Sequence, residues 1–264
     1  MNGERVRDPQ RLIAVGAAVE RMYEPPLASR AGYKLQHALI RFPVSVSGKV
    51  LLDAGSATGG FTDCLLRHGA RHVHCVDVAH GALTYRLRKD PRTSVHERTN
   101  VMHLSGDSLQ PPPDGAVCDL SFRSLRRAAA RLLGLTGEHW LVALIKPQFE
   151  LAAAPAARAP GTRFDGRVIG PEAITTVVTA LVRDLAAEGV VVQGCTPAPV
   201  RGRRGNREVL ALLTAGERPA AEAAWPDAVA TLRRDLQQPP GAIGDYGAAG
   251  VAPTNVARPI GFPM

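Results

Sequence analysis

Short apolar runs alternate with helix-like stretches along most of this chain. Seven of the runs predict strands, at residues 49–55, 71–78, 93–100, 115–122, 139–147, 190–197 and 207–215. Helix-like stretches lie between many of them, at residues 60–70, 81–90, 124–135 and 171–189. Apolar strands separated by helices favour a parallel sheet that is covered on both faces. The pattern therefore predicts a doubly wound α/β domain with a mostly parallel, seven-stranded sheet, spanning about residues 45–216.

Outside the alternating region the pattern changes. Residues 151–170 have no apolar periodicity, so we expect a mobile loop beside the fifth strand. The residues from about 237 onwards are rich in proline and glycine, which is typical of an irregular tail. We expect three parts: an N-terminal helical segment at 1–28 with a helix at about 9–23, the main domain at 29–216, and a C-terminal segment at 217–264 that begins with a helix at 217–236.

Composition narrows the class of protein. A chain of 264 residues with 45% hydrophobic content suits one α/β domain, alone or with a small appendage. The sequence has no run of about 18 apolar residues and begins with the mixed-charge stretch "MNGERVRDPQ". We therefore expect neither a membrane span nor a secretory signal, and a cytoplasmic location.

The four cysteines are far apart in the sequence, at positions 64, 75, 118 and 195. None forms a CxxC pair, and three lie in apolar segments. We expect reduced thiols, without a disulfide framework or a structural zinc site.

The net charge is +8, which favours a polyanionic partner such as nucleic acid. Arginine richness can also follow from genome composition, and the abundant alanine, glycine and proline fit that alternative. Both interpretations stay open on charge alone.

The first strand runs into a glycine-rich turn, "LLDAGSATGGF". Gly55, Gly59 and Gly60 allow a tight turn and a close approach of backbone to a ligand. The spacing matches neither the GxGxxG dinucleotide fingerprint nor a phosphate-binding P-loop. Asp53 would repel a pyrophosphate, but it would suit a cationic amino group. The turn therefore points to S-adenosyl-L-methionine as the cofactor.

A second acid supports this cofactor. Asp77 ends the next strand, where a carboxylate can hold ribose hydroxyls, and Asn100 follows the third strand, where an adenine edge would lie. A structural glycine turn with solvated polar residues is the alternative. The candidate cofactor-binding residues are Asp53, Gly55, Ser56, Thr58, Gly59, Gly60, Phe61, Asp77, Asn100 and Asp119.

Lysine is rare here, and one lysine stands in an unusual place. Only four of the 32 cationic residues are lysines, and Lys146 directly follows the apolar run "VALI". Asp119 and Glu208 lie at strand ends on the same predicted edge of the sheet, and Lys34 could reach it from an N-terminal helix. A partly buried lysine among other charges can serve as a general base, whereas arginine keeps its proton. Taken singly, each residue is more often a solvated side chain, a cap or a salt bridge.

Several motifs together resemble a known family. "SRAGYKL", "LLDAGSATGGFTDCLL", "VDVAHGAL", "ERTN", "DLSF", "LIKPQFE" and "GNREVLALL", within residues 29–215, resemble the FtsJ-type 2′-O-ribose methyltransferases, above all their TlyA-type rRNA methyltransferase/haemolysin branch. The resemblance implies a Rossmann-like fold and a catalytic Lys-Asp-Lys-Glu tetrad. Its members in this sequence are Lys34, Asp119, Lys146 and Glu208. In the implied mechanism Lys146 accepts the proton of the hydroxyl, Lys34 stabilises the alkoxide, and the two acids orient the lysines.

The resemblance leaves the acceptor open, because the TlyA branch carries an N-terminal S4 RNA-binding domain. The 28 residues before "SRAGYKL" are too few for it, so we expect it to be missing. The acceptor can still be RNA, held through arginine–phosphate contacts. Candidates are Arg30, Arg86, Arg88, Arg201, Arg203 and Arg204. The alternatives are a small metabolite bearing a hydroxyl or an amine, and a non-catalytic RNA- or ribosome-binding protein. His72 and His74 share one strand face, but two histidines make a weak metal site.

Overall fold

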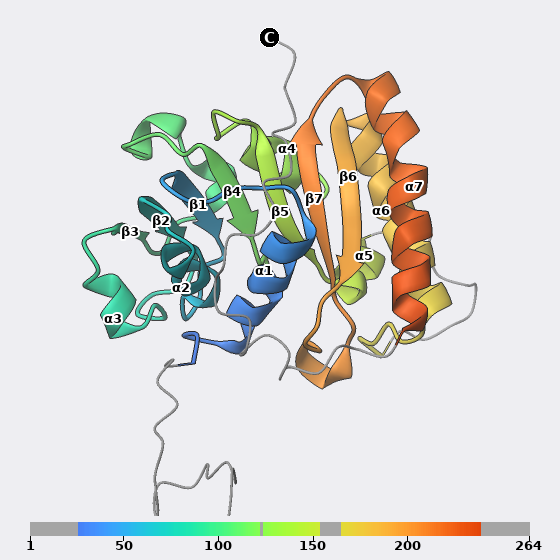
Figure 1. Ribbon diagram of the computed structural model, residues 1–264, viewed down its shortest axis with the longest axis horizontal. Helices are drawn as coiled ribbons and strands as arrows, with labels where there is room; N and C mark the ends of the chain where they lie inside the picture. Colours follow the sequence, from blue (N-terminus) through green and yellow to red (C-terminus); the bar gives the residue numbers. More distant parts are fainter. Residues whose placement is uncertain (1–25, 122–123, 154–164, 239–264) are drawn as a thin grey trace, which may run out of the picture.

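The computed structural model describes residues 26–121, 124–153 and 165–238. Seven strands form one sheet in the order β3-β2-β1-β4-β5-β7-β6, and only β7 runs antiparallel to its neighbours (Figure 1). The strands are β1 (Val50–Ala54), β2 (His72–Val76), β3 (Thr93–His96), β4 (Gly115–Cys118), β5 (Trp140–Ile145), β6 (Val190–Pro197) and β7 (Val209–Ala215). The prediction of a doubly wound, mostly parallel seven-stranded sheet is confirmed.

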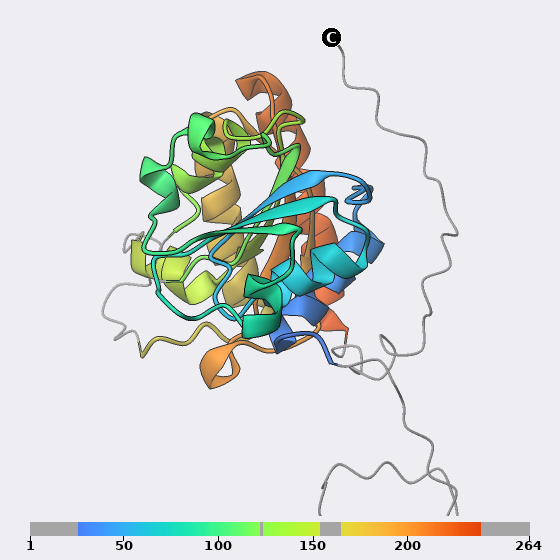
Figure 2. The same ribbon diagram turned by 90° about the vertical axis from the view of Figure 1, so that its left-hand side faces the viewer.

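Helices cover both faces of the sheet (Figure 2). The α-helices are α1 (Arg30–Arg41), α2 (Gly60–Arg67), α3 (Tyr85–Arg88), α4 (Ala128–Leu133), α5 (Pro147–Ala153), α6 (Pro171–Ala187) and α7 (Arg218–Gln237). Short 3-10 helices lie at η1 (Val101–His103), η2 (Gly106–Ser108) and η4 (Arg203–Gly205). Helices α1, α2 and α3 share one core with the sheet, and α4, α6 and α7 share the other.

The strand sequences explain this two-sided burial. Along β5, Leu141 and Ala143 join the core beneath α4, α6 and α7, whereas Val142 and Leu144 join the core beneath α1 and α2. Successive side chains of a strand point to opposite faces, so a strand buried on both faces must be apolar at every position. This requirement produces the continuous apolar runs that identify the strands in the sequence.

Several predicted boundaries are wrong. The helix expected at 81–90 is reduced to α3, because Thr84 directly before it has a non-helical ψ of 143°. The helix expected at 124–135 shortens to α4, since Arg127 ahead of it has a φ of 62°. The loop expected at 151–170 is wrong at its start, because α5 extends to Ala153, and residues 154–164 lie outside the described residues. The helix expected at about 9–23 and the tail from 239 lie outside the described residues.

The described part of the chain contains no helix long and apolar enough to cross a membrane. Cys64, Cys75, Cys118 and Cys195 are all buried free thiols. Burial raises the pKa of Cys75 and Cys195 to about 12, so these thiols stay protonated and pack as small apolar side chains.

Candidate active site

A loop at the carboxyl end of β1 forms one wall of the site. Gly55 has a φ of 84°, and a Cβ there would lie 2.6 Å from the carbonyl oxygen of Asp119. Gly59 has a φ of 92° and caps the N-terminus of α2. Both positions therefore need glycine, as the sequence indicated: the first because β4 is close, and the second because the chain turns sharply into a helix.

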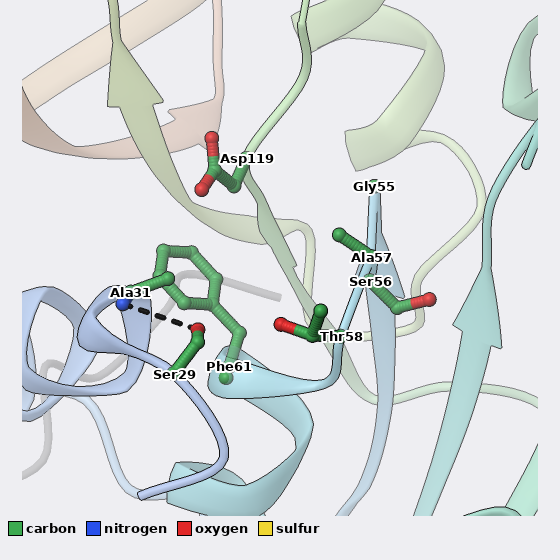
Figure 3. Close-up of a pocket in the computed structure, with 9 residues that line it drawn as sticks. Ser29, Ala31, Gly55, Ser56, Ala57, Thr58, Phe61 and Asp119 are labelled. Carbon is green, nitrogen blue, oxygen red and sulfur yellow. Dashed lines mark hydrogen bonds between the residues drawn. The ribbon is translucent and has the colours of Figure 1, made fainter. Parts of the chain in front are cut away.

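A small pocket opens between this loop and the start of α1 (Figure 3). It is lined by Ser29, Ala31, Gly55, Ser56, Ala57, Thr58, Gly60, Phe61 and Asp119. The Asp119 carboxylate and the Phe61 ring reach it from the end of β4 and from α2 (Figure 3). The pocket thus gathers Gly55, Ser56, Thr58, Gly60, Phe61 and Asp119, six of the ten predicted cofactor residues.

Ser29 and Ala31 were not among the predicted site residues. Ser29 is the N-cap of α1 and accepts a hydrogen bond from the Ala31 amide at 3.3 Å. Helix α1 lies so close to α2 that a Cβ on Gly60 would approach Ser29 Oγ to 2.2 Å. The signal was present in the "SRAG" stretch, which places an N-cap serine before a small-residue helix start.

Asp53 lies in the interior, next to the pocket loop but not in the pocket lining. Its Oδ2 accepts a hydrogen bond from Thr62 Oγ1 at 2.6 Å, and its buried Oδ1 has no hydrogen-bond partner. Burial raises the pKa of Asp53 to about 7, although the Thr62 hydrogen bond opposes the shift. The structure therefore holds a buried acceptor that ionises near neutral pH.

This shifted pKa predicts a specific pH dependence of stability. Asp53 ordinarily titrates at 3.8 but near 7 in the folded protein, so between these values only the folded state holds the proton. Its contribution to folding is complete below pH 3.8 and is lost as the pH rises to about 7. Relative to Asp53→Asn, the wild-type free energy of unfolding should fall by about 2–3 kcal/mol from pH 5 to pH 8. Urea denaturation of both proteins measures this difference, and parallel pH profiles would contradict it.

Asp77 and Asn100 support neighbouring loops rather than lining the pocket. Asp77 accepts hydrogen bonds from the amides of Ala57 at 2.8 Å and Ala79 at 2.7 Å. It therefore fixes the pocket loop to the end of β2. Asn100 caps η1 through the Met102 amide at 3.1 Å. Their proposed contacts with ribose and adenine remain predictions.

Two ion pairs bring together the four residues Lys34, Asp119, Lys146 and Glu208. Lys34 Nζ lies 2.5 Å from Glu208 Oε2, and both side chains are buried. Lys146 Nζ lies 2.6 Å from Asp119 Oδ1 and also donates to Ser121 Oγ at 3.1 Å. The pairing links segments that are up to 174 residues apart in the sequence.

The sheet register places the two pairs side by side. Ile145 of β5 is directly opposite Val209 of β7, so Lys146 and Glu208 extend from the same end of adjacent antiparallel strands. Asp119 follows β4 on the other side of β5 and donates its amide to the Ala54 carbonyl at 3.0 Å. The ion pairs and the pocket loop therefore form one continuous edge of the sheet.

The loop before Glu208 carries arginines beside this edge. A Cβ on Gly202 would come within 2.1 Å of Glu208 Oε1, so the loop passes directly against the carboxylate. Arg201 and Arg204 are exposed on this loop, and Arg203 begins η4. The other candidate arginines differ in their surroundings: Arg86 pairs with Asp63, Arg88 pairs with Glu97, and Arg30 is exposed.

His72 and His74 of β2 form a separate cluster with His96 of β3. His72 contacts Ser94 Oγ at 2.9 Å, and His74 contacts His96 at 3.2 Å and the Pro111 carbonyl at 2.8 Å. Burial lowers the pKa of His74 to about 4, so it stays neutral. Among the described residues no group of three or more His, Cys, Asp or Glu side chains has the arrangement of a metal site.

Comparison with known proteins gives a consistent result. Residues 27–213 match the family model of FtsJ-like methyltransferases. The chain is 40% identical over 185 residues to YqxC of Bacillus subtilis, which is named as an rRNA methyltransferase, covering 69% of this chain and 63% of YqxC. It is 39% identical over 181 residues to the 16S/23S rRNA (cytidine-2′-O)-methyltransferase TlyA of Mycobacterium tuberculosis, covering 68% of this chain and 65% of that protein. The chain thus spans slightly less than two thirds of either relative.

A solved structure is similar over nearly its whole length. It is that of a Lactococcus lactis protein described as a hemolysin, with 30% sequence identity and a TM-score of 0.69. The match covers 80% of this chain and 98% of that one.

Proposed function

Because the chain belongs to the FtsJ-like methyltransferase family, we propose that it methylates a ribose 2′-hydroxyl of RNA. The protein is an S-adenosylmethionine-dependent methyltransferase by family and fold. The proposal of ribose 2′-hydroxyl methylation rests on two lysine–carboxylate contacts, Lys34–Glu208 and Lys146–Asp119. They lie at the edge of the sheet that also forms the pocket.

The pocket has the chemistry that S-adenosylmethionine requires. The methionine part of the cofactor carries a cationic amino group. Asp119 presents a carboxylate in the pocket lining. Asp119 Oδ1 is paired with the Lys146 ammonium at 2.6 Å, which holds this carboxylate in place in the pocket lining. Gly55 and Gly60 keep the loop free of side chains where the backbone faces the pocket. We assign the cofactor to this pocket.

Gly55 provides a direct test of the pocket. In Gly55→Ala the new methyl group would meet the Asp119 carbonyl, and the backbone strain of a positive φ adds to this clash. We expect affinity for S-adenosylmethionine to fall by at least about tenfold, measured by titration calorimetry. Gly48→Ala is the matched control, since Gly48 has a φ of 73° but no atom within 4 Å of its Cβ position. Equal losses of affinity in both variants would count against the pocket.

The four charged residues then have distinct roles in methyl transfer. When bound, the cofactor supplies the methyl group on a sulfonium centre. Lys146 in its amine form accepts the proton of the ribose hydroxyl, as a general base does. Lys34 stabilises the developing alkoxide, and Asp119 and Glu208 hold the two lysine side chains in place. Positioning of the two reactants supplies much of the remaining acceleration.

RNA is the acceptor that the charge distribution favours. The chain has a net charge of +8, and Arg201 and Arg204 are exposed on the loop that packs against Glu208. Arginines in this position can contact the phosphates on either side of the reacting ribose. The relatives YqxC and TlyA are both named as rRNA methyltransferases. Ribosomal RNA is therefore the substrate class that we propose.

The test uses S-adenosylmethionine labelled in the methyl group, with purified ribosomal subunits and naked rRNA as acceptors. We expect label in RNA, at a nucleotide that becomes resistant to alkaline cleavage because its 2′-hydroxyl is blocked. If the cofactor binds but no RNA is labelled, the RNA proposal fails and a small-molecule acceptor becomes the better explanation.

A further inference from the structure

We propose that Glu150 is a positioning residue that holds Asp119 and Ser121 against Lys146. Glu150 lies in the first turn of α5, four residues after Lys146, and its backbone amide donates to the Lys146 carbonyl at 3.2 Å. Its side chain is buried, with only 2% of its surface exposed. A carboxylate is costly to bury unless its oxygens are bound, so its partners reveal what it does.

All the side-chain partners of Glu150 come from the chain that follows Asp119. Ser124 Oγ donates to Oε2 at 2.5 Å, and the Leu125 amide donates to Oε1 at 2.9 Å. Arg126 Nη1 donates to Oε2 at 2.9 Å. Burial raises the pKa of the Glu150 carboxyl, and the bonds from Ser124 and Leu125 oppose that shift. The carboxylate thus fastens one segment, residues 124–126, to the helix that starts beside Lys146.

The two groups that touch the Lys146 ammonium lie earlier in the same stretch of chain, between β4 and Ser124. Asp119 Oδ1 lies 2.6 Å from Lys146 Nζ, and Ser121 Oγ accepts its hydrogen bond at 3.1 Å. Asp119 and Ser121 therefore lie in the sequence between β4 and the three residues that Glu150 holds, and residues 122 and 123 between them are outside the described part of the chain. General-base catalysis depends on the direction in which the amine points. A small shift of residues 119–121 would therefore change the orientation of the Lys146 amine without removing any group that touches the substrate.

Arg126 makes a second side-chain contact, with α6, which provides a control for the contact with Glu150. Arg126 also donates from Nε to Asp184 Oδ2 of α6 at 2.6 Å, but Asp184 is about half exposed. This contact fastens the segment to a different helix and lies outside the link to α5. Asp184→Asn is therefore a matched control for Glu150→Gln, since both replace a carboxylate partner of Arg126 with an amide.

The test measures the reactivity of each lysine by competitive acetylation with acetic anhydride and mass spectrometry, on the full chain without RNA. The four lysines give only four amines to follow. The Lys146 nitrogen is held by Asp119 and Ser121 and its side chain is only 11% exposed, so release of these two groups would make the nitrogen more accessible to the reagent. In Glu150→Gln we expect acetylation of Lys146 to rise by about 3- to 10-fold at a fixed pH. Lys34, Lys49 and Lys89 should keep their wild-type rates, and Asp184→Asn should leave all four unchanged.

Two outcomes would overturn the proposal. If Lys146 reacts at the wild-type rate in folded Glu150→Gln, Glu150 does not position its partners. If all four lysines rise together, the variant has only loosened the fold. Should Glu150→Gln fail to fold, Ser124→Ala removes one donor from the same carboxylate and must give a smaller rise at Lys146 alone. The proposal rests on the assignment of Lys146 as the base, but the measurement needs no methyl acceptor, so failure of the RNA assay and failure of this test are distinguishable.

Discussion

Lys146→Met is expected to lower the rate of methyl transfer by about 10²- to 10⁴-fold, the effect of removing a general base. Methionine keeps the unbranched apolar part of the side chain but cannot accept a proton. Lys146 Nζ lies beside Asp119, and its side chain is only 11% exposed, so solvent cannot easily replace the amine. The initial rate with labelled S-adenosylmethionine and ribosomal RNA measures the loss. Cofactor affinity, measured separately, should change by less than about threefold.

Two further lysine variants make this result specific. Lys146→Arg keeps a positive charge beside Asp119 but cannot give up its proton, so it should be as inactive as Lys146→Met. Lys89→Met removes an exposed lysine at the end of α3 and should retain full activity. Wild-type activity in Lys146→Arg would mean that the residue acts through charge alone, and the assignment of a base would be wrong.

Glu208→Ala is expected to lower the free energy of unfolding by about 3–5 kcal/mol, because it leaves the Lys34 ammonium buried without its carboxylate. Lys34 and Glu208 are 8% and 3% exposed, and Gly202 packs directly against the Glu208 carboxylate. Urea denaturation at pH 7 measures the change. The variant should also lose activity, since the Lys34 side chain is no longer held in place.

A double variant separates stability from catalysis. In Lys34→Met with Glu208→Leu the buried charge is replaced by apolar side chains of similar volume, which should restore most of the lost stability. Methyl transfer should stay at the level of the single variant, because no ammonium remains to stabilise the alkoxide. If Glu208→Ala costs less than about 1 kcal/mol, the pair behaves as a surface salt bridge and the site is more open than the structure indicates.

The strands and the pocket loop could be predicted from the sequence because their signals are local. Burial on both faces makes a strand such as β5 apolar at every position, and a loop that takes a positive φ beside another strand requires glycine at Gly55. Lys146 stood out for a related reason, since a lysine after an apolar run is rare in this arginine-rich chain. Each feature is visible within about ten residues of sequence.

Features that depend on contacts between distant segments could not be predicted in the same way. Ser29 lines the pocket only because α1 packs closely on α2 through Gly32 and Gly60. The side-chain partners of Glu150 lie on residues 124–126, although the glutamate itself is part of the "KPQFE" stretch. The glycine-rich turn indicated that Asp53 would face the cofactor, but its side chain lies in the interior and accepts a hydrogen bond from Thr62. Pairing partners far apart in sequence leave no local pattern.

The position of β7 between β5 and β6 has a consequence for the order in which the protein can become active. During synthesis β6 emerges from the ribosome before β7. Strand β6 can join the rest of the sheet only when β7 inserts between β5 and β6. Glu208 immediately precedes β7 and is the partner of Lys34, which was synthesised 174 residues earlier. A nascent chain that stops short of β7 therefore has the cofactor loop and Lys146 but lacks the second ion pair. Under the proposed roles of the four charged residues, methyl transfer therefore requires the last strand of the sheet to be in place.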